Sequence, residues 1–439
     1  INETMLDCKT LEAEMVKTEF NFNTLFHRTV GAFFHLLKSS LGSGLLAMPA
    51  AFKHTGLVVG TIGTFVVAFI ATHCIQILVR TSQEICKEAE KPSLSYADTC
   101  EAVFKHGPKK LQNYSNFVRH FMDYSMAGVC LGGTSIYIMF IASSVKDLCD
   151  HFIPDQKLSI EMYCLILLLP LMLITQFRYL KFLVPFSVFA NICLGLTVCI
   201  TCYYCLIDIP DVRERDLTVN IAEWPMFIST AIFAMEGINV VMPVENEMAN
   251  PQHFLGCPGI LNATMIFVAL LYSLVGLLGY VKFGNDVRGS VTLNLPQDEP
   301  LAITAITLVA IAVFLTYCLQ MYAPIDIIWN RLQDKINCKY HNISQIILRI
   351  LCVGLSVILA VAVPDLEILI GLVGAIFFST LGLLTPTIVE TVHKWERGLG
   401  RYNWILWKNA VLLIFYLVVL FAGCYTSVRE IVARFDKVK

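Results

Sequence analysis

The chain has 439 residues, of which 56% are hydrophobic and only 15% are charged. Soluble domains carry about 25% charged residues, so this composition excludes a disordered chain, a nucleic-acid-binding protein and an ordinary soluble enzyme. The formal net charge of −2 is too small to indicate a partner. A mean hydropathy of +0.66 indicates a protein that crosses a membrane several times.

Residues 1–29 are polar and carry no apolar run of the kind found in a signal peptide. The 16 cysteines fall mostly inside apolar runs, where cysteine packs as a small hydrophobe. Cys199, Cys202 and Cys205 resemble an iron–sulfur signature, but they lie within a span and the C-P ending is missing. We therefore expect core packing at these cysteines, and no metal or organic cofactor.

Apolar runs of about 20 residues predict eleven membrane spans, within one transmembrane domain over residues 30–428. The expected limits are 30–51, 57–79, 117–145, 159–176, 181–207, 224–245, 257–283, 301–329, 344–363, 367–390 and 404–428. Residues 429–439 form a C-terminal tail.

Lys and Arg are concentrated in the segments that lie inside if the N-terminus is cytoplasmic. With an odd number of spans, this places the C-terminus outside or in a lumen, although the tail itself is basic. In the largest inner segment, 80–116, Ser95 and Asp98 form a helix-capping pattern. This pattern predicts an amphipathic helix on the membrane face, and the alternative is a plain polar loop.

A glycine-rich stretch interrupts the first span, where Gly42, Ser43 and Gly44 are followed by Pro49. Glycine is conformationally permissive and proline removes a backbone donor, which predicts an unwound stretch at membrane depth. Such backbone is tolerated only where it faces protein or a wet cavity. The alternative is a close helix crossing, since small residues also serve packing.

The sixth span carries a similar interruption, with Gly237 followed by Pro243. Paired interruptions in corresponding positions of two halves are typical of inverted-repeat transporters that bind substrate at the midplane. We therefore predict an all-α polytopic membrane protein with a 5+5 repeat. Repeat one covers about 30–207 and repeat two about 224–390, and the helix at 404–428 is an addition.

The two breaks together predict a binding site for a zwitterion. Helix N-terminal N–H groups attract a carboxylate, and C-terminal carbonyls attract an ammonium group. We expect the carboxylate at the backbone of Gly42, Ser43 and Gly44, and the ammonium at the carbonyls of Phe233, Ala234 and Met235. Tyr137 and Tyr317 are candidates for the end of the pocket that limits side-chain size.

Several runs resemble one family in chain order: His35–Pro49, Ala231–Asn246, Gly279–Pro296, Thr316–Ile328 and Leu372–Pro386. They are similar to the proton-coupled amino-acid transporters within the amino acid/auxin permease family. The resemblance covers essentially the whole chain from Phe26 onward.

The resemblance implies a leucine-transporter-type fold and symport of small neutral amino acids such as glycine, alanine or proline with protons. It implies a plasma membrane or a lysosomal or endosomal membrane. His35 resembles the family's span-1 histidine, which is central to proton coupling. Cys149 resembles one partner of an outer disulfide, but Gln297–Glu299 stand where the second cysteine is expected.

Charged groups inside spans are costly and are functional candidates. His35 is a candidate to carry the proton, and the alternative is a neutral histidine bonded to a neighbouring helix. We expect a structural role for Lys38. Glu236 has three open roles, in carrying the proton, holding the amino group or fixing the break. Asp123 and Asp326 are candidate gate or packing groups, and Glu245 and Glu247 are expected at the interface.

Two function classes remain open. The first is a secondary transporter, and the second is an amino-acid sensor that signals to a protein partner with little net flux. Enzymes are disfavoured because the sequence shows no HExxH, GxSxG or P-loop pattern. The candidate partner-binding segments, 1–29 and 80–116, are short, which favours the transporter.

Overall fold

The computed structural model describes residues 33, 36–37, 40, 42–91, 93–153, 158–176, 184–235, 237–248, 253–256 and 259–438. These residues form helices, turns and irregular segments, with no strand among them. The predicted all-α class is therefore confirmed.

The α-helices cover the predicted spans. They are α2 (Ser43–Lys53), α3 (Leu57–Glu88), α4 (Tyr96–Lys105), α5 (Ser115–Phe152), α6 (Ile160–Ile174), α7 (Val184–Leu206), α8 (Trp224–Met235), α9 (Ile238–Glu247), α10 (Ile260–Phe283), α11 (Pro300–Leu332), α12 (His341–Ala362), α13 (Leu366–Val373), α14 (Thr385–Lys394) and α15 (Trp404–Val438). However, α3 ends at Glu88 rather than 79, and α15 continues to Val438 through the predicted tail. Two π-helical stretches, Gly374–Phe378 and Thr380–Leu384, join α13 to α14.

Within the described part of the chain, 8 helices are long and apolar enough to cross a membrane. They correspond to predicted spans 2, 3, 5 and 7–11. The fourth span is the shorter helix α6, and the first and sixth spans are interrupted. The chain is thus a multi-pass membrane protein, and the short helices α2, α8 and α9 lie at the two predicted breaks.

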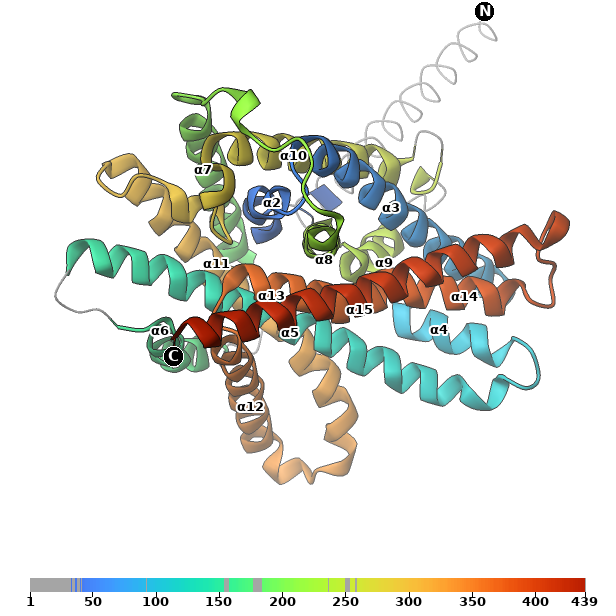
Figure 1. The fold of residues 1–439 in the computed structure, drawn as a ribbon. Helices are drawn as coiled ribbons and strands as arrows, with labels where there is room; N and C mark the ends of the chain where they lie inside the picture. Colours follow the sequence, from blue (N-terminus) through green and yellow to red (C-terminus); the bar gives the residue numbers. More distant parts are fainter. Residues whose placement is uncertain are drawn as a thin grey trace, which may run out of the picture.

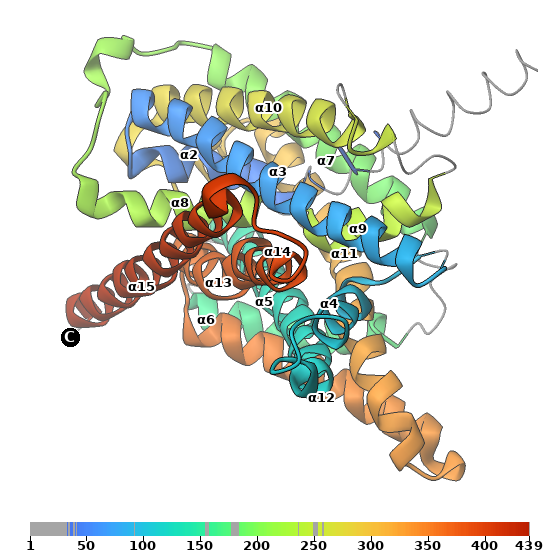
Figure 2. The ribbon, with the colours of Figure 1, turned by 90° about the vertical axis from the view of Figure 1, so that its right-hand side faces the viewer.

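The breaks lie inside the bundle. α2 packs against α8 and α10, while α5 packs against α11 and α12. Figures 1 and 2 show α2 and α10 on one side of α5 and α11, with α12 on the opposite side. α15 runs along α8, α13 and α14 (Figure 2).

Glycines allow α2 to approach its neighbours closely. A Cβ at Gly44 would lie 2.7 Å from Cα of Ala234 in α8, and one at Gly279 would lie 2.4 Å from Pro49. The close-crossing interpretation of the first span therefore holds at Gly44. Gly42 differs, because nothing lies within 4 Å of a Cβ built there.

The helix predicted after Ser95 is present as α4. The Ser95 side chain accepts a hydrogen bond from the Asp98 backbone N–H at 3.2 Å. Its apolar side, including Val103 and Phe104, is buried against α5 and α14. The predicted amphipathic helix is therefore present with its apolar side packed on neighbouring helices, and its position at the membrane face stays a prediction.

Candidate functional site

The predicted interruptions are present in the first and the sixth span. Gly42 has an extended backbone (φ −127°, ψ −159°) and precedes α2. α8 ends at Met235, and Gly237 lies just before α9 with φ −123°. Each interruption therefore leaves a helix end inside the bundle, where the first N–H groups and last carbonyls of a helix have no partner in their own helix.

The structure brings the two predicted halves of the site together. Ser43 and Gly44 form the first turn of α2, and Ala234 and Met235 form the last turn of α8. The closeness of Gly44 to Ala234 sets these turns side by side. Donor N–H groups and acceptor carbonyls thus lie within the span of one small molecule, with opposite partial charges.

Tyr272 on α10 connects the two interruptions, and the sequence reasoning missed it. Its hydroxyl lies 2.5 Å from the backbone oxygen of Ser40 and 2.9 Å from that of Ala234. The backbone amide of Gly42 is a further neighbour of this hydroxyl. The signal was a tyrosine within an otherwise apolar run, because a buried tyrosine hydroxyl needs a hydrogen-bond partner.

The two aromatic residues predicted at the end of the pocket, Tyr137 and Tyr317, lie in different parts of the bundle. Tyr137 on α5 is half-buried, and its hydroxyl is near enough to that of Tyr272 to act on it electrostatically. Tyr317 on α11 is fully buried, and its hydroxyl lies 3.0 Å from Oγ of Ser356 on α12. Since α12 lies across the bundle from α2 (Figure 1), the structure brings Tyr137 and not Tyr317 to the breaks.

Phe233 and Met235 point their side chains to other neighbours. The ring of Phe233 meets that of Phe378 edge-on, with centroids 5.2 Å apart. Met235 and Gly237 line a small apolar cavity of about 30 Å³, together with residues of α3, α15 and the π-helical stretch Thr380–Leu384. The contribution of these residues to the predicted site is therefore through their backbone carbonyls.

His35, Lys38 and Glu236 lie outside the described residues. The proton-carrying roles considered for His35 and Glu236 stay predictions. Cys149 is a free cysteine in the structure, in line with the absence of a cysteine at Gln297–Glu299.

Other charged residues of the spans form links between helices. Asp123 of α5 pairs with Arg331 of α11. Glu245 of α9 accepts a hydrogen bond from Nε2 of Gln83 at 2.8 Å, while Asp326 contacts Asn330 within α11 at 3.2 Å. Asp123 and Glu245 thus lie where a shift of one helix against another would break a contact.

Comparison with known proteins agrees with this architecture. The family model "Transmembrane amino acid transporter protein" matches residues 28–429. The "Proton-coupled amino acid transporter-like protein pathetic" of Drosophila melanogaster is 39% identical over 403 residues, which cover 92% of this chain and 85% of that protein. The "Probable amino acid transporter skat-1" of Caenorhabditis elegans is 25% identical over 413 residues, with 92% and 90% covered. The chain therefore belongs to the transmembrane amino acid transporter family, the amino acid/auxin permeases that its sequence motifs resemble.

Proposed function

We propose that this amino acid transporter is a secondary active symporter, which moves small neutral amino acids such as glycine, alanine or proline together with protons. The observation that carries the proposal is the meeting of the α2 start with the α8 end beside Tyr272. Family membership implies a non-enzyme, and we propose no catalytic residue.

The chemistry of the two helix ends suits a zwitterion. The substrate carboxylate accepts hydrogen bonds from the backbone N–H groups of Gly42, Ser43 and Gly44. The ammonium group donates to the carbonyls of Phe233, Ala234 and Met235. The described residues on these turns are uncharged, and a zwitterionic amino acid likewise carries no net charge.

Tyr137 limits the size of the substrate side chain in this proposal. It lies on α5 with a half-buried side chain, and its hydroxyl acts electrostatically on that of Tyr272, which contacts both breaks. A bulky substrate would have to displace this ring. Glycine, alanine and proline fit such a site best.

Alternating access in this proposal uses α2 and α8 as the moving unit. The two half-helices approach so closely that a Cβ at Gly44 would lie 2.7 Å from Cα of Ala234, and we expect them to move as one unit against α5 and α11. Breaking and remaking contacts such as Glu245 with Gln83 then opens one side at a time.

We assign proton transfer to His35, with Glu236 as the alternative carrier. Histidine changes charge at mildly acidic pH, and the name of the Drosophila relative supports proton coupling. We place the protein in the plasma membrane or a lysosomal or endosomal membrane. The N-terminus is cytoplasmic and the C-terminus outside or lumenal.

Uptake into proteoliposomes tests the proposal. With an imposed inward proton gradient, labelled glycine, alanine or proline should accumulate above its outside concentration, and a protonophore should abolish that accumulation. Binding of these amino acids without flux under any gradient would favour the sensor. The absence of both binding and flux would reject the assigned substrate class.

A further inference from the structure

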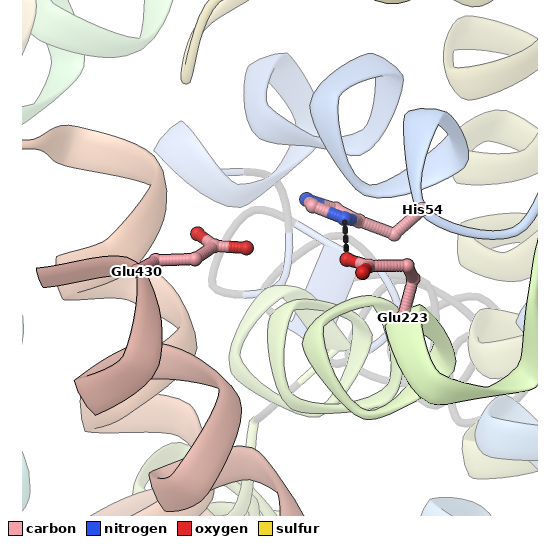
Figure 3. A group of neighbouring side chains, drawn as sticks. All are labelled: His54, Glu223 and Glu430. Carbon is pink, nitrogen blue, oxygen red and sulfur yellow. Dashed lines mark ion pairs between the residues drawn. The ribbon is translucent and has the colours of Figure 1, made fainter. Parts of the chain in front are cut away.

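A histidine and two glutamates from distant segments meet at the end of the bundle that holds the turn between α2 and α3. His54 follows α2, Glu223 directly precedes α8 and Glu430 lies on α15. One ligand atom from each lies within 4.8 Å of the others. Figure 3 shows His54 and Glu223 in contact, with the carboxylate of Glu430 directed at them. None of these residues belongs to the amino-acid site.

The imidazole of His54 is held in one orientation. Its Nε2 lies 2.5 Å from Oε1 of Glu367, and the other oxygen of Glu367 accepts from Nζ of Lys53 at 2.8 Å. An Nε2–H group that donates to Glu367 leaves a lone pair on Nδ1. This carboxylate–histidine arrangement fixes the tautomer of metal-binding histidines in proteins.

In this tautomer the unprotonated Nδ1 is directed at carboxylate oxygens, which accept hydrogen bonds and do not donate them. It lies 3.5 Å from Oε2 of Glu223 and makes no hydrogen bond among the described residues, although the side chain is only 8% exposed. A lone pair that faces a carboxylate is repelled unless a cation lies between them. An imidazole nitrogen favours Zn²⁺ and its neighbours in the transition series over Ca²⁺ or Mg²⁺.

One carboxylate of the cluster has no cationic partner among the described residues. Lys53 pairs with Glu367, and Arg429 pairs with Oε1 of Glu223 at 2.9 Å. Within the part of the chain that is described, Glu430 makes no ion pair with a cation. A cation held between Nδ1, Glu223 and Glu430 would have this carboxylate as its counter-ion.

We propose that His54, Glu223 and Glu430 form a binding site for a divalent transition-metal ion such as Zn²⁺. Two ligands of a tetrahedral zinc at about 2.0–2.1 Å lie roughly 3.3 Å apart, close to the 3.5 Å between His54 and Glu223. Glu430 completes three ligands by a side-chain shift of about 1–1.5 Å. Water or its second oxygen fills the fourth position.

The site also joins the moving unit to the rest of the bundle. His54 and Glu223 are attached to the two half-helices of the amino-acid site, while Glu430 is on α15. A bound metal holds α2 and α8 against α15 and slows transport. This consequence rests on the proposed function, whereas binding of the metal does not.

Binding is measured with the purified full chain and Zn²⁺ alone, by calorimetry and by the shift in melting temperature. His54→Gln and Glu430→Gln should each weaken the Zn²⁺ affinity tenfold or more and remove the zinc-dependent rise in melting temperature. Asp298→Asn removes an exposed acid outside the cluster and should change neither. Removal of the orienting carboxylate by Glu367→Gln should weaken binding by about 10–100-fold.

Equal Zn²⁺ affinity in the parent, His54→Gln and Glu430→Gln would overturn the site and assign the metal to thiols elsewhere. No binding to the parent would also overturn it. In proteoliposomes, zinc should inhibit uptake by the parent and not by His54→Gln. Zinc binding at this site in a chain without any uptake would reject the transport proposal and keep the metal site.

Discussion

The hydroxyl of Tyr272 lies 2.9 Å from the backbone oxygen of Ala234, so α10 is bonded to the last turn of α8. The same hydroxyl lies 2.5 Å from the backbone oxygen of Ser40, before α2. A hydroxyl has one hydrogen and donates to one carbonyl at a time. Tyr272 is therefore a shared partner of the two interrupted spans.

Tyr272→Phe should destabilise the protein and impair uptake. The change leaves buried carbonyls without their donor, which costs about 1–3 kcal/mol. We expect a lower melting temperature and a lower uptake rate, measured on the same preparation. Tyr203→Phe, at an exposed tyrosine of α7, is the matched control and should change neither. A Tyr272→Phe variant with parental melting temperature and uptake would contradict the role given to this hydroxyl.

Gly42→Ala and Gly44→Ala should separate binding from packing. A methyl group at 44 would meet the α8 backbone at 2.7 Å, and overpacking of this kind costs about 1–3 kcal/mol. Gly44→Ala should therefore lower both the melting temperature and uptake. At Gly42 the backbone conformation is open to any residue, and a Cβ has free space.

Gly42→Ala should keep the parental melting temperature and raise the KM for glycine, because its methyl group enters the space proposed for the carboxylate. Uptake assays over a range of glycine concentrations measure this. An unchanged KM in Gly42→Ala would remove the carboxylate from this position. A Gly44→Ala variant as stable as the parent would show that α2 can move away from α8 at little cost.

The sequence was sufficient to locate the breaks because they follow from local backbone chemistry. Gly42 and Gly237 lie at the breaks, where a residue without a side chain has a low preference for the helix, while Pro49 and Pro243 lie within α2 and α9 and each removes a donor there. The positions of the membrane spans likewise follow directly from the eleven apolar runs. These features depend on neighbouring residues in the chain and not on the arrangement of helices.

The direction of a side chain within the bundle was beyond sequence reasoning. α11 is apolar on all sides, so its hydrophobic pattern does not show that Tyr317 turns to Ser356 on α12. The partners of Tyr272 and the meeting of His54 with Glu430 depend on contacts between segments far apart in the chain. Only the packed structure determines such contacts.

Thiol labelling should establish the orientation in the membrane. Asp286 and Lys110 are both exposed and lie in loops predicted to face opposite sides. In a chain whose exposed Cys199 is replaced by Ser, an impermeant reagent added outside cells or to a lumenal face should label a cysteine at 286 or at the C-terminus. It should miss a cysteine at 110 until the membrane is opened. Labelling at 110 from the outside would reverse the proposed orientation.

The last prediction concerns proton coupling. If His35 carries the driving proton, uptake should rise as the side of substrate entry is acidified through the histidine range, around an unperturbed pKa of about 6.5. His35→Asn should bind substrate but lose concentrative, pH-driven uptake, since an amide does not titrate. Exchange of amino acid across the membrane should persist in this variant, because the backbone groups at Gly42–Gly44 are unchanged. Uptake, exchange and binding at several pH values measure these three properties separately.

Glu236→Gln is the matched variant, because it tests the rival carrier. Full pH-driven accumulation in His35→Asn, together with its loss in Glu236→Gln, would assign the proton to the sixth span and reject His35. Retention in both would mean that coupling uses another ion or another residue. Loss in His35→Asn alone would support the proposed carrier, and would limit Glu236 to holding the substrate or the break.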